Sequence, residues 1–216
     1  MKLNKFIDHT LLKPNATEEM IKNLCNEAMK YNFFSVCVNP DFVRLAKNKL
    51  EGSDVKVACV VGFPLGANKT EIKAKEAELA VEDGADEIDM VINVSKLKDR
   101  DYEYVLDEIN RIKKACGCTL KVIIETSLLT KDEIAKMCEI VNMSKADCIK
   151  TSTGFVGEGA KEEDVALMAK LIKAPKFIKA SGGIRDYDTA LKMITLGARR
   201  LGVSAGVIIA NDERNV

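Results

Sequence analysis

The sequence has no excess of charge of either sign, because 33 lysine and arginine residues balance 33 aspartate and glutamate residues. The pI is about 6.6. Nucleic acids and anionic membranes attract proteins with a strong positive charge or a clustered basic face. We therefore expect no nucleic-acid partner and no electrostatic attachment to a membrane.

Long apolar runs are also missing. The N-terminal stretch MKLNKFIDHTLLKP has no apolar segment of signal-peptide length, and no segment of the chain is apolar for long enough to span a bilayer. The seven cysteines are then expected to be reduced thiols in a cytoplasm. These absences predict a cytoplasmic protein.

No cluster of cysteine and histidine residues has the spacing of a metal site. His9 is the only histidine, and the Cys116-Gly117-Cys118 pair has no second pair of cysteine or histidine residues near it. A structural zinc site takes four such ligands. We expect no metal site.

What the sequence does contain is an alternation of strand-like and helix-like segments. Most of the strand-like runs are continuously apolar, as expected for strands covered on both faces. These runs lie at residues 6–10, 33–38, 55–63, 86–93, 120–126, 147–152, 176–181 and 200–204.

The segments between these runs carry helix start signals. Thr17 precedes EEMIKNLCNEAMK, Pro40 opens DFVRLAKNKL, and Thr130 with Glu133 forms a capping box ahead of IAKMCEIV. Eight strand–helix units without a linker predict a single (β/α)₈ barrel domain over residues 1–216. The alternative is an open doubly wound sheet. Such a fold is expected to carry a G-x-G-x-x-G dinucleotide-binding turn after an early strand, and GFPLGANK does not match that pattern.

The phrase I-K-x-S-x-G occurs twice, as IKTSTG and IKASGG. Each copy carries a lysine, Lys150 or Lys179, toward the C-terminal end of a strand, where barrels carry their chemistry. Counting along the strands from the preceding turns aligns Asp89 and Gly202 with them, so we expect matching heights. Snorkelling lysines and a salt bridge to Asp89 are the structural alternatives.

Two buried lysines side by side suggest amine chemistry. Burial and a neighbouring ammonium both favour the neutral amine, which can attack a carbonyl and form a Schiff base. A carboxylate such as Asp89 could then move protons between water and the intermediates. The sequence alone does not indicate which of Lys150 and Lys179 is the nucleophile.

The glycine-rich ends of the last two strands, SGGIRD and GVSAG, predict a phosphate site, because backbone N–H groups at such loops bind phosphate in barrels. We expect Gly182, Gly183, Gly202 and Ser204 to donate these bonds, with Arg185 as a nearby charge. Ordinary turns and helix caps are the alternative explanation.

Three other residues near the predicted strand ends are expected to be mainly structural. Asp8 and His9 could orient one another near the site, although a core hydrogen bond is the favoured role for His9. Cys37 is expected to be a buried, inert thiol.

Nearly the whole sequence resembles the deoxyribose-phosphate aldolases, a family of class I aldolases. The resemblance rests on IDHTLLKP, VCVNP, VGFPLGANKTEIKAKEAE, GADEIDMVIN, KVIIETSLLT, IKTSTGF, IKASGGIRD and GVS. It implies a (β/α)₈ barrel that reversibly cleaves 2-deoxy-D-ribose 5-phosphate to D-glyceraldehyde 3-phosphate and acetaldehyde. It also implies no metal or organic cofactor and a homodimer or homotetramer.

The resemblance assigns roles to three residues. Lys150 would form the Schiff base, Lys179 would lower the pKa of that amine and relay protons, and Asp89 would act as proton-transfer acid and base. The chain departs from the family in GVSAG, where further hydroxyl groups are more usual, and in Lys161, where a threonine is usual. The last helix is expected to be short.

Two rival functions share these residues. One is another Schiff-base aldolase that acts on a sugar phosphate. The other is a non-catalytic barrel that binds a phosphosugar, in which the lysines only neutralise the charge of the ligand.

Overall fold

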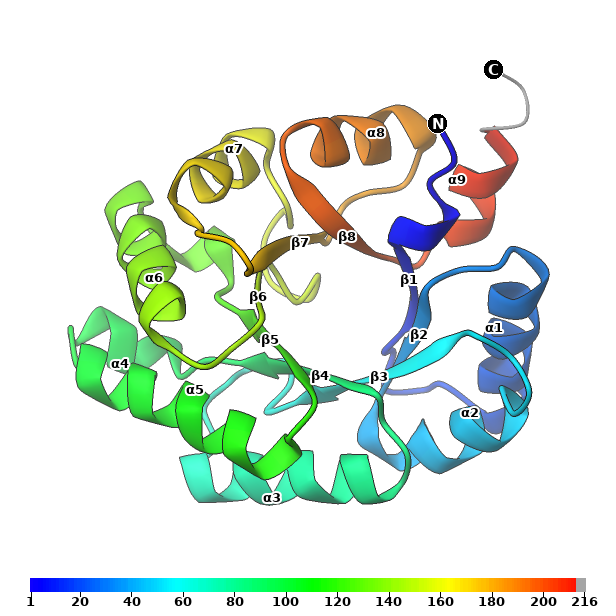
Figure 1. The fold of residues 1–216 in the computed structure, drawn as a ribbon, viewed down its shortest axis with the longest axis horizontal. Helices are drawn as coiled ribbons and strands as arrows, with labels where there is room; N and C mark the ends of the chain where they lie inside the picture. The colour runs from blue at the N-terminus through cyan, green and yellow to red at the C-terminus, as the bar shows by residue number, and fades with distance from the viewer. Residues whose placement is uncertain (213–216) are drawn as a thin grey trace.

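The computed structural model describes residues 1–212, which form a closed barrel of parallel strands inside a ring of helices (Figure 1). The strands pair in chain order, and the last pairs back with the first. They are β1 (Ile7–Leu11), β2 (Ser35–Val38), β3 (Lys56–Val61), β4 (Glu87–Val91), β5 (Thr119–Ile123), β6 (Cys148–Lys150), β7 (Phe177–Ser181) and β8 (Ala198–Val203). The predicted (β/α)₈ barrel is confirmed, and each predicted run overlaps one strand.

Helices follow the strands and cover the outside of the barrel (Figure 1). They are α1 (Glu18–Lys30), α2 (Val43–Lys49), α3 (Thr70–Glu82), α4 (Val94–Lys98), α5 (Tyr102–Cys116), α6 (Lys131–Met143), α7 (Glu162–Leu171), α8 (Tyr187–Thr195) and α9 (Gly206–Asp212). The sequence did not predict α4, which shares one connection with α5. Within residues 1–212, no helix has both the length and the apolar character needed to cross a membrane.

The predicted helix starts are confirmed, with one difference. Thr17 accepts a hydrogen bond from the Met20 N–H at 3.3 Å, and Thr130 and Glu133 form the reciprocal capping box. Pro40 opens a 3₁₀ turn, Pro40–Phe42, and α2 begins only after it. The fixed backbone angle of proline suits either kind of first turn.

Two clusters of buried apolar side chains pack the barrel. Alternate strand residues such as Val57, Ile88 and Val122 are fully buried in the main core, which also includes the inner faces of the helices. A second, smaller cluster lies apart from that core and consists of Leu12, Cys37, Ala58 and Val60. Charged side chains occupy much of the remaining interior, and the lysines predicted from the repeated phrase are among them.

Candidate active site

Strands β6 and β7 bring the two lysines of the repeated phrase together. Lys150 and Lys179 are direct partners in the β6–β7 register, so their predicted equal height is confirmed. Each Nζ donates to the same atom, Asp89 Oδ2, at 2.8 Å. The two amines therefore share one carboxylate oxygen.

The predicted alignment is wrong for the other two residues in that count. Asp89 pairs with Lys121 on β5, and Gly202 pairs with Ser181 on β7, not with Lys179. The strands of a barrel tilt and are staggered, so residues at one level are not always partners in the ladder. The Asp89 carboxylate nevertheless reaches both lysines, because it points into the barrel.

Asp89 is fully buried and stays ionised. Burial alone would raise the pKa of Asp89, but three lysines around it hold that pKa well below the ordinary value. The salt bridge considered as an alternative role for Asp89 is present, and it involves Lys121 in addition to Lys150 and Lys179.

Sequence reasoning missed Lys121. Its side chain is fully buried, and its Nζ lies 2.7 Å from Asp89 Oδ1 and 2.7 Å from Glu87 Oε2. A lysine inside the apolar run KVIIET was the available signal, and it is of the same kind as the one that marked Lys150.

Asp8 takes a different part from the one expected. It forms ion pairs with Lys179 and with Arg200, whose Nη1 lies 2.8 Å from Asp8 Oδ1. His9 points the other way, out of the barrel, and its Nε2 lies 2.6 Å from Glu27 Oε2 on α1. The two neighbours do not orient one another. His9 is buried and makes a hydrogen bond, as expected, but its partner Glu27 is 47% exposed and does not lie in the core.

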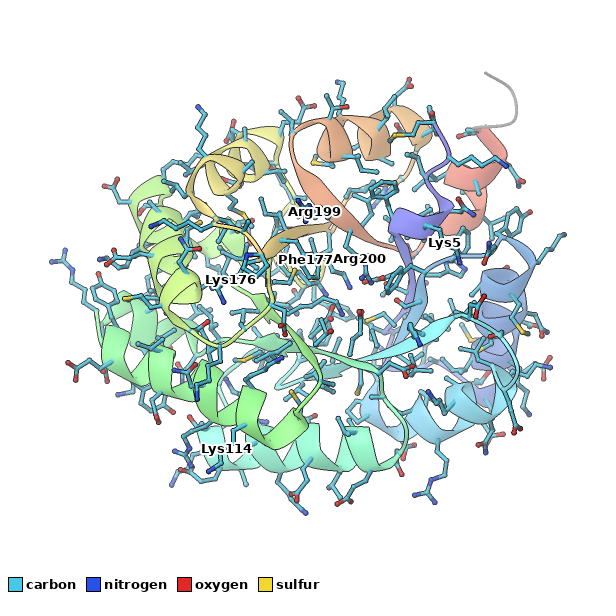
Figure 2. All side chains as sticks on the ribbon, viewed as in Figure 1. Lys5, Lys114, Lys176, Phe177, Arg199 and Arg200 are labelled. Carbon is cyan, nitrogen blue, oxygen red and sulfur yellow. The ribbon has the colours of Figure 1, made fainter. Side chains whose placement is uncertain are left out.

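Arg200 closes these contacts into a loop, since its Nη1 also lies 3.1 Å from Glu87 Oε2. Its guanidinium covers the Phe34 ring, and Figure 2 shows it beside Phe177 near the centre of the barrel. We call the closed set the charge ring. In order around the loop, its members are Asp89, Lys179, Asp8, Arg200, Glu87 and Lys121.

Acids and bases alternate around the charge ring, so its formal charges cancel. Burial favours the neutral forms of Lys121 and Lys179, but the carboxylates on either side raise the pKa of both amines above the ordinary value. Lys150 binds the ring only through Asp89 and is the surplus cation. It can lose its proton without leaving a buried carboxylate unpaired.

A pocket of about 370 Å³ opens beside Lys150. Lys150 lines it, whereas Lys179 and Asp89 are fully buried. Two further cations, Lys13 and Arg185, lie along the wall, and no carboxylate is among the described residues that line it. All the predicted phosphate-binding residues line the pocket: Gly182, Gly183, Gly202 and Ser204.

The glycines also have structural reasons to be there. A Cβ on Gly182 would lie 2.8 Å from Gly159 Cα, and one on Gly183 would lie 2.8 Å from the Glu158 carbonyl oxygen. Both glycines have positive φ values, which side chains disfavour. A Cβ on Gly202 would lie 3.0 Å from Lys179 Cε, so this glycine leaves room for the second lysine.

A second missed residue, Glu125, supports the loop after β6. It is buried and has a left-handed φ of 53°. Its carboxylate accepts hydrogen bonds from the hydroxyl and, at 3.2 Å, the N–H of Thr153, which lines the pocket. Cys37 is buried in the small apolar cluster, where burial raises the pKa of its thiol, in accord with the predicted inert role.

Comparisons with known proteins agree with the resemblance to aldolases. The DeoC/LacD family aldolase model matches residues 3–211. Two proteins named deoxyribose-phosphate aldolase are close in sequence. The one from Metamycoplasma arthritidis is 54% identical, covering 98% of both chains, and the one from Thermococcus gammatolerans is 53% identical, covering 100% of this chain and 98% of its own.

Solved structures give the same result. A putative deoxyribose-phosphate aldolase from Coccidioides immitis has a TM-score of 0.97 at 44% identity, covering 99% of this chain and 86% of its own. The tetrameric deoxyribose phosphate aldolase from Aeropyrum pernix has a TM-score of 0.90 at 34% identity, covering 98% of this chain and 91% of its own. On the family match and these identities, the chain belongs to the DeoC/LacD family of aldolases.

Proposed function

We propose that this protein reversibly cleaves 2-deoxy-D-ribose 5-phosphate to D-glyceraldehyde 3-phosphate and acetaldehyde through a Schiff base on Lys150. The names of the relatives support the substrate. The observation that carries the mechanism is the surplus position of Lys150, which lines the pocket and binds a charge ring that is neutral without it.

The geometry favours Lys150 over Lys179 as the nucleophile. Lys179 is fully buried between Asp8 and Asp89, so its deprotonation would leave two carboxylates with one fewer cation. It donates to the same carboxylate oxygen as Lys150, so it lies beside the nucleophile as a fixed cation.

In the direction of synthesis, the neutral Lys150 amine adds to the carbonyl of acetaldehyde, and loss of water gives an iminium. The iminium loses a methyl proton and becomes an enamine, which attacks the aldehyde of D-glyceraldehyde 3-phosphate. Water then releases the product. Asp89 is the proposed group for the proton transfers, because its Oδ2 accepts a hydrogen bond from the reacting amine at 2.8 Å, while Lys179 stays charged beside the same oxygen.

The substrate phosphate is proposed to bind at the loops after β7 and β8, on the N–H groups around Gly182, Gly183, Gly202 and Ser204. Val203 and Ala205 offer no side-chain donor there. Lys13 and Arg185, on the same pocket wall, can supply the positive charge that this phosphate needs.

Reduction with borohydride in the presence of acetaldehyde tests the mechanism. Peptide mass spectrometry should find a two-carbon adduct on Lys150 and none on Lys179, and a Lys150→Met variant should lose it. Absence of an adduct at every lysine would favour the phosphosugar-binding barrel. An adduct that forms with a ketose phosphate but not with acetaldehyde would favour a different Schiff-base aldolase.

We also propose that the chain acts in the cytoplasm as a homo-oligomer. The free cysteines of the described residues fit a reducing compartment, and one relative of the same fold is tetrameric. Light scattering of the purified protein measures the mass in solution, and a monomer at micromolar concentration would contradict the second part.

A further inference from the structure

The seven cysteines fall into two classes. Five are single buried cysteines, and burial raises the pKa of each thiol above its ordinary value. They are Cys25, Cys37, Cys59, Cys138 and Cys148. Cys116 and Cys118 differ because they occur as a pair separated by one glycine. The proposed aldolase chemistry makes no use of this pair.

The pair sits where α5 ends and β5 begins (Figure 1). This is the N-terminal end of the strands, opposite the end that carries the pocket. Gly117 caps α5 with a left-handed φ of 62°, and a Cβ at this position would meet nothing within 4 Å. This turn folds the chain back and lets the two thiols face one another.

Contacts around the turn hold it in this form. Cys116 Sγ lies 3.6 Å from the Lys113 carbonyl oxygen and 3.8 Å from that of Cys118. The Lys113 ammonium donates to the Cys118 carbonyl at 2.6 Å and to Asp147 Oδ2 at 2.6 Å. The Lys113 ammonium is thereby fixed beside the backbone of the pair.

The thiols differ in acidity. A hydrogen bond from the Cys118 thiol, helped by backbone donors and Lys113 and opposed by burial, lowers the pKa of Cys116 to about 7. The same bond raises the pKa of Cys118. Cys116 is buried at 4% exposure and Cys118 is half-buried, so the pair meets solvent through Cys118. A thiolate beside a resolving thiol is the arrangement of thiols that oxidise reversibly.

We propose that Cys116 and Cys118 form a redox-active dithiol that hydrogen peroxide converts to an intramolecular disulfide. The Cys116 thiolate attacks one peroxide oxygen, so an S–O bond forms, the O–O bond breaks and hydroxide leaves. The Cys118 sulfur then attacks Cys116 Sγ, so the S–S bond forms, the S–O bond breaks and the oxygen leaves as water. In total, two thiols and one peroxide give one disulfide and two waters, and a thiol reductant reverses the change.

Mass spectrometry of peroxide-treated protein tests the proposal. Trypsin should release both cysteines in the single peptide ACGCTLK, residues 115–121. After treatment with a few equivalents of peroxide and alkylation of the remaining thiols, this peptide should lack two hydrogens and carry no label. The peptides of the five single cysteines should stay labelled.

Two variants separate the roles of the thiols. Cys118→Ser should leave Cys116 as a sulfenic acid that dimedone traps, and Cys116→Ser should leave Cys118 reduced at the same dose. Iodoacetamide at pH 7 should modify Cys116 at least ~10-fold faster than Cys25 in the folded protein, because more of it is thiolate. Circular dichroism checks that both variants fold.

Two results would overturn the proposal. One is a peptide 115–121 that stays reduced while peptides of the single cysteines oxidise. The other is a wild-type peptide that accumulates sulfinic acid at Cys116 with no disulfide. Neither result depends on aldolase activity, so the proposed function and this inference can fail separately.

Discussion

On the side of β2 and β3, the barrel interior holds small apolar side chains and Ser35, whose hydroxyl donates to Asp8 at 2.7 Å. From β4 round to β1, the interior holds the charge ring. Both halves belong to one sheet. The apolar half demonstrates that the barrel can be filled without charge. Buried ion pairs are often no more stabilising than apolar residues of similar volume. The ring is therefore best explained by chemistry at Lys150 and not by stability.

The largest effect is expected where the surplus cation is removed. Lys150→Met should lower the rate of deoxyribose 5-phosphate cleavage by at least ~10³-fold, because no amine is left to form the Schiff base. The free energy of unfolding should change little, since the charge ring stays balanced. A coupled assay for glyceraldehyde 3-phosphate measures the rate, and full activity in this variant would refute the assignment of the nucleophile.

Removing a member of the ring should instead cost stability. Lys121→Met leaves Glu87 and Asp89 with one cation fewer and should lower the free energy of unfolding by about 3–5 kcal/mol. Urea unfolding measures this loss. Adding Glu87→Gln to Lys121→Met removes one charge of each sign and should recover part of the stability.

A matched control lies outside the barrel, between α3 and α5. Lys73 and Glu108 form a fully buried ion pair at 2.8 Å. Lys73→Met should destabilise the protein to a similar degree and leave the cleavage rate of the folded enzyme unchanged, whereas Lys121→Met should lower both. Equal activity in the two variants would mean that the ring has no role in catalysis.

The ring should also make stability depend on acid. The pKa values of Asp8 and Asp89 are depressed in the folded state. Their contribution is therefore complete above the unfolded value of about 4, and it is lost as the pH falls toward the folded values. Urea unfolding at several acidic pH values should give a falling free energy, and Asp8→Asn should make that slope shallower.

Charge on the pocket wall should affect binding only. Lys13→Gln should raise KM for 2-deoxyribose 5-phosphate by about 10-fold, because one charge-assisted contact to phosphate is lost. The same variant should cleave unphosphorylated 2-deoxyribose as wild type does. An equal effect on both sugars would show that Lys13 does not act on the phosphate.

The smallest effect is expected in the apolar half. Val60→Ala removes two methyl groups from the small cluster and should cost about 1–3 kcal/mol of unfolding free energy. Its cleavage rate should stay within about twofold of wild type, since no charge moves. A fall in activity as large as that of Lys121→Met would erase the distinction between the two halves.

The sequence predicted correctly those features that depend on one segment of the chain or on two neighbouring strands. Apolar runs and capping residues predicted the strands and helix starts, and the repeated phrase predicted the pairing of Lys150 and Lys179. These features depend on neighbours within one or two elements, which local patterns describe well.

The charge ring could not be predicted in this way, because barrel closure decides its contacts. Asp8 and Arg200 stand at opposite ends of the chain and meet only because β8 pairs with β1. The stagger of the strands also decided that Asp89 pairs with Lys121. A count along single strands contains neither the closure nor the stagger.

The contact between Gly159 and Gly182 has a consequence for redesign of the pocket. The two backbones meet so closely that neither position can accept a side chain, and the Ala160 N–H donates to the Gly182 carbonyl at 3.0 Å. The loops after β6 and β7 are thus packed together as one unit. A loop exchanged to admit a bulkier acceptor aldehyde must be transplanted together with its neighbour, since a new loop on one strand alone would collide with the old loop on the other.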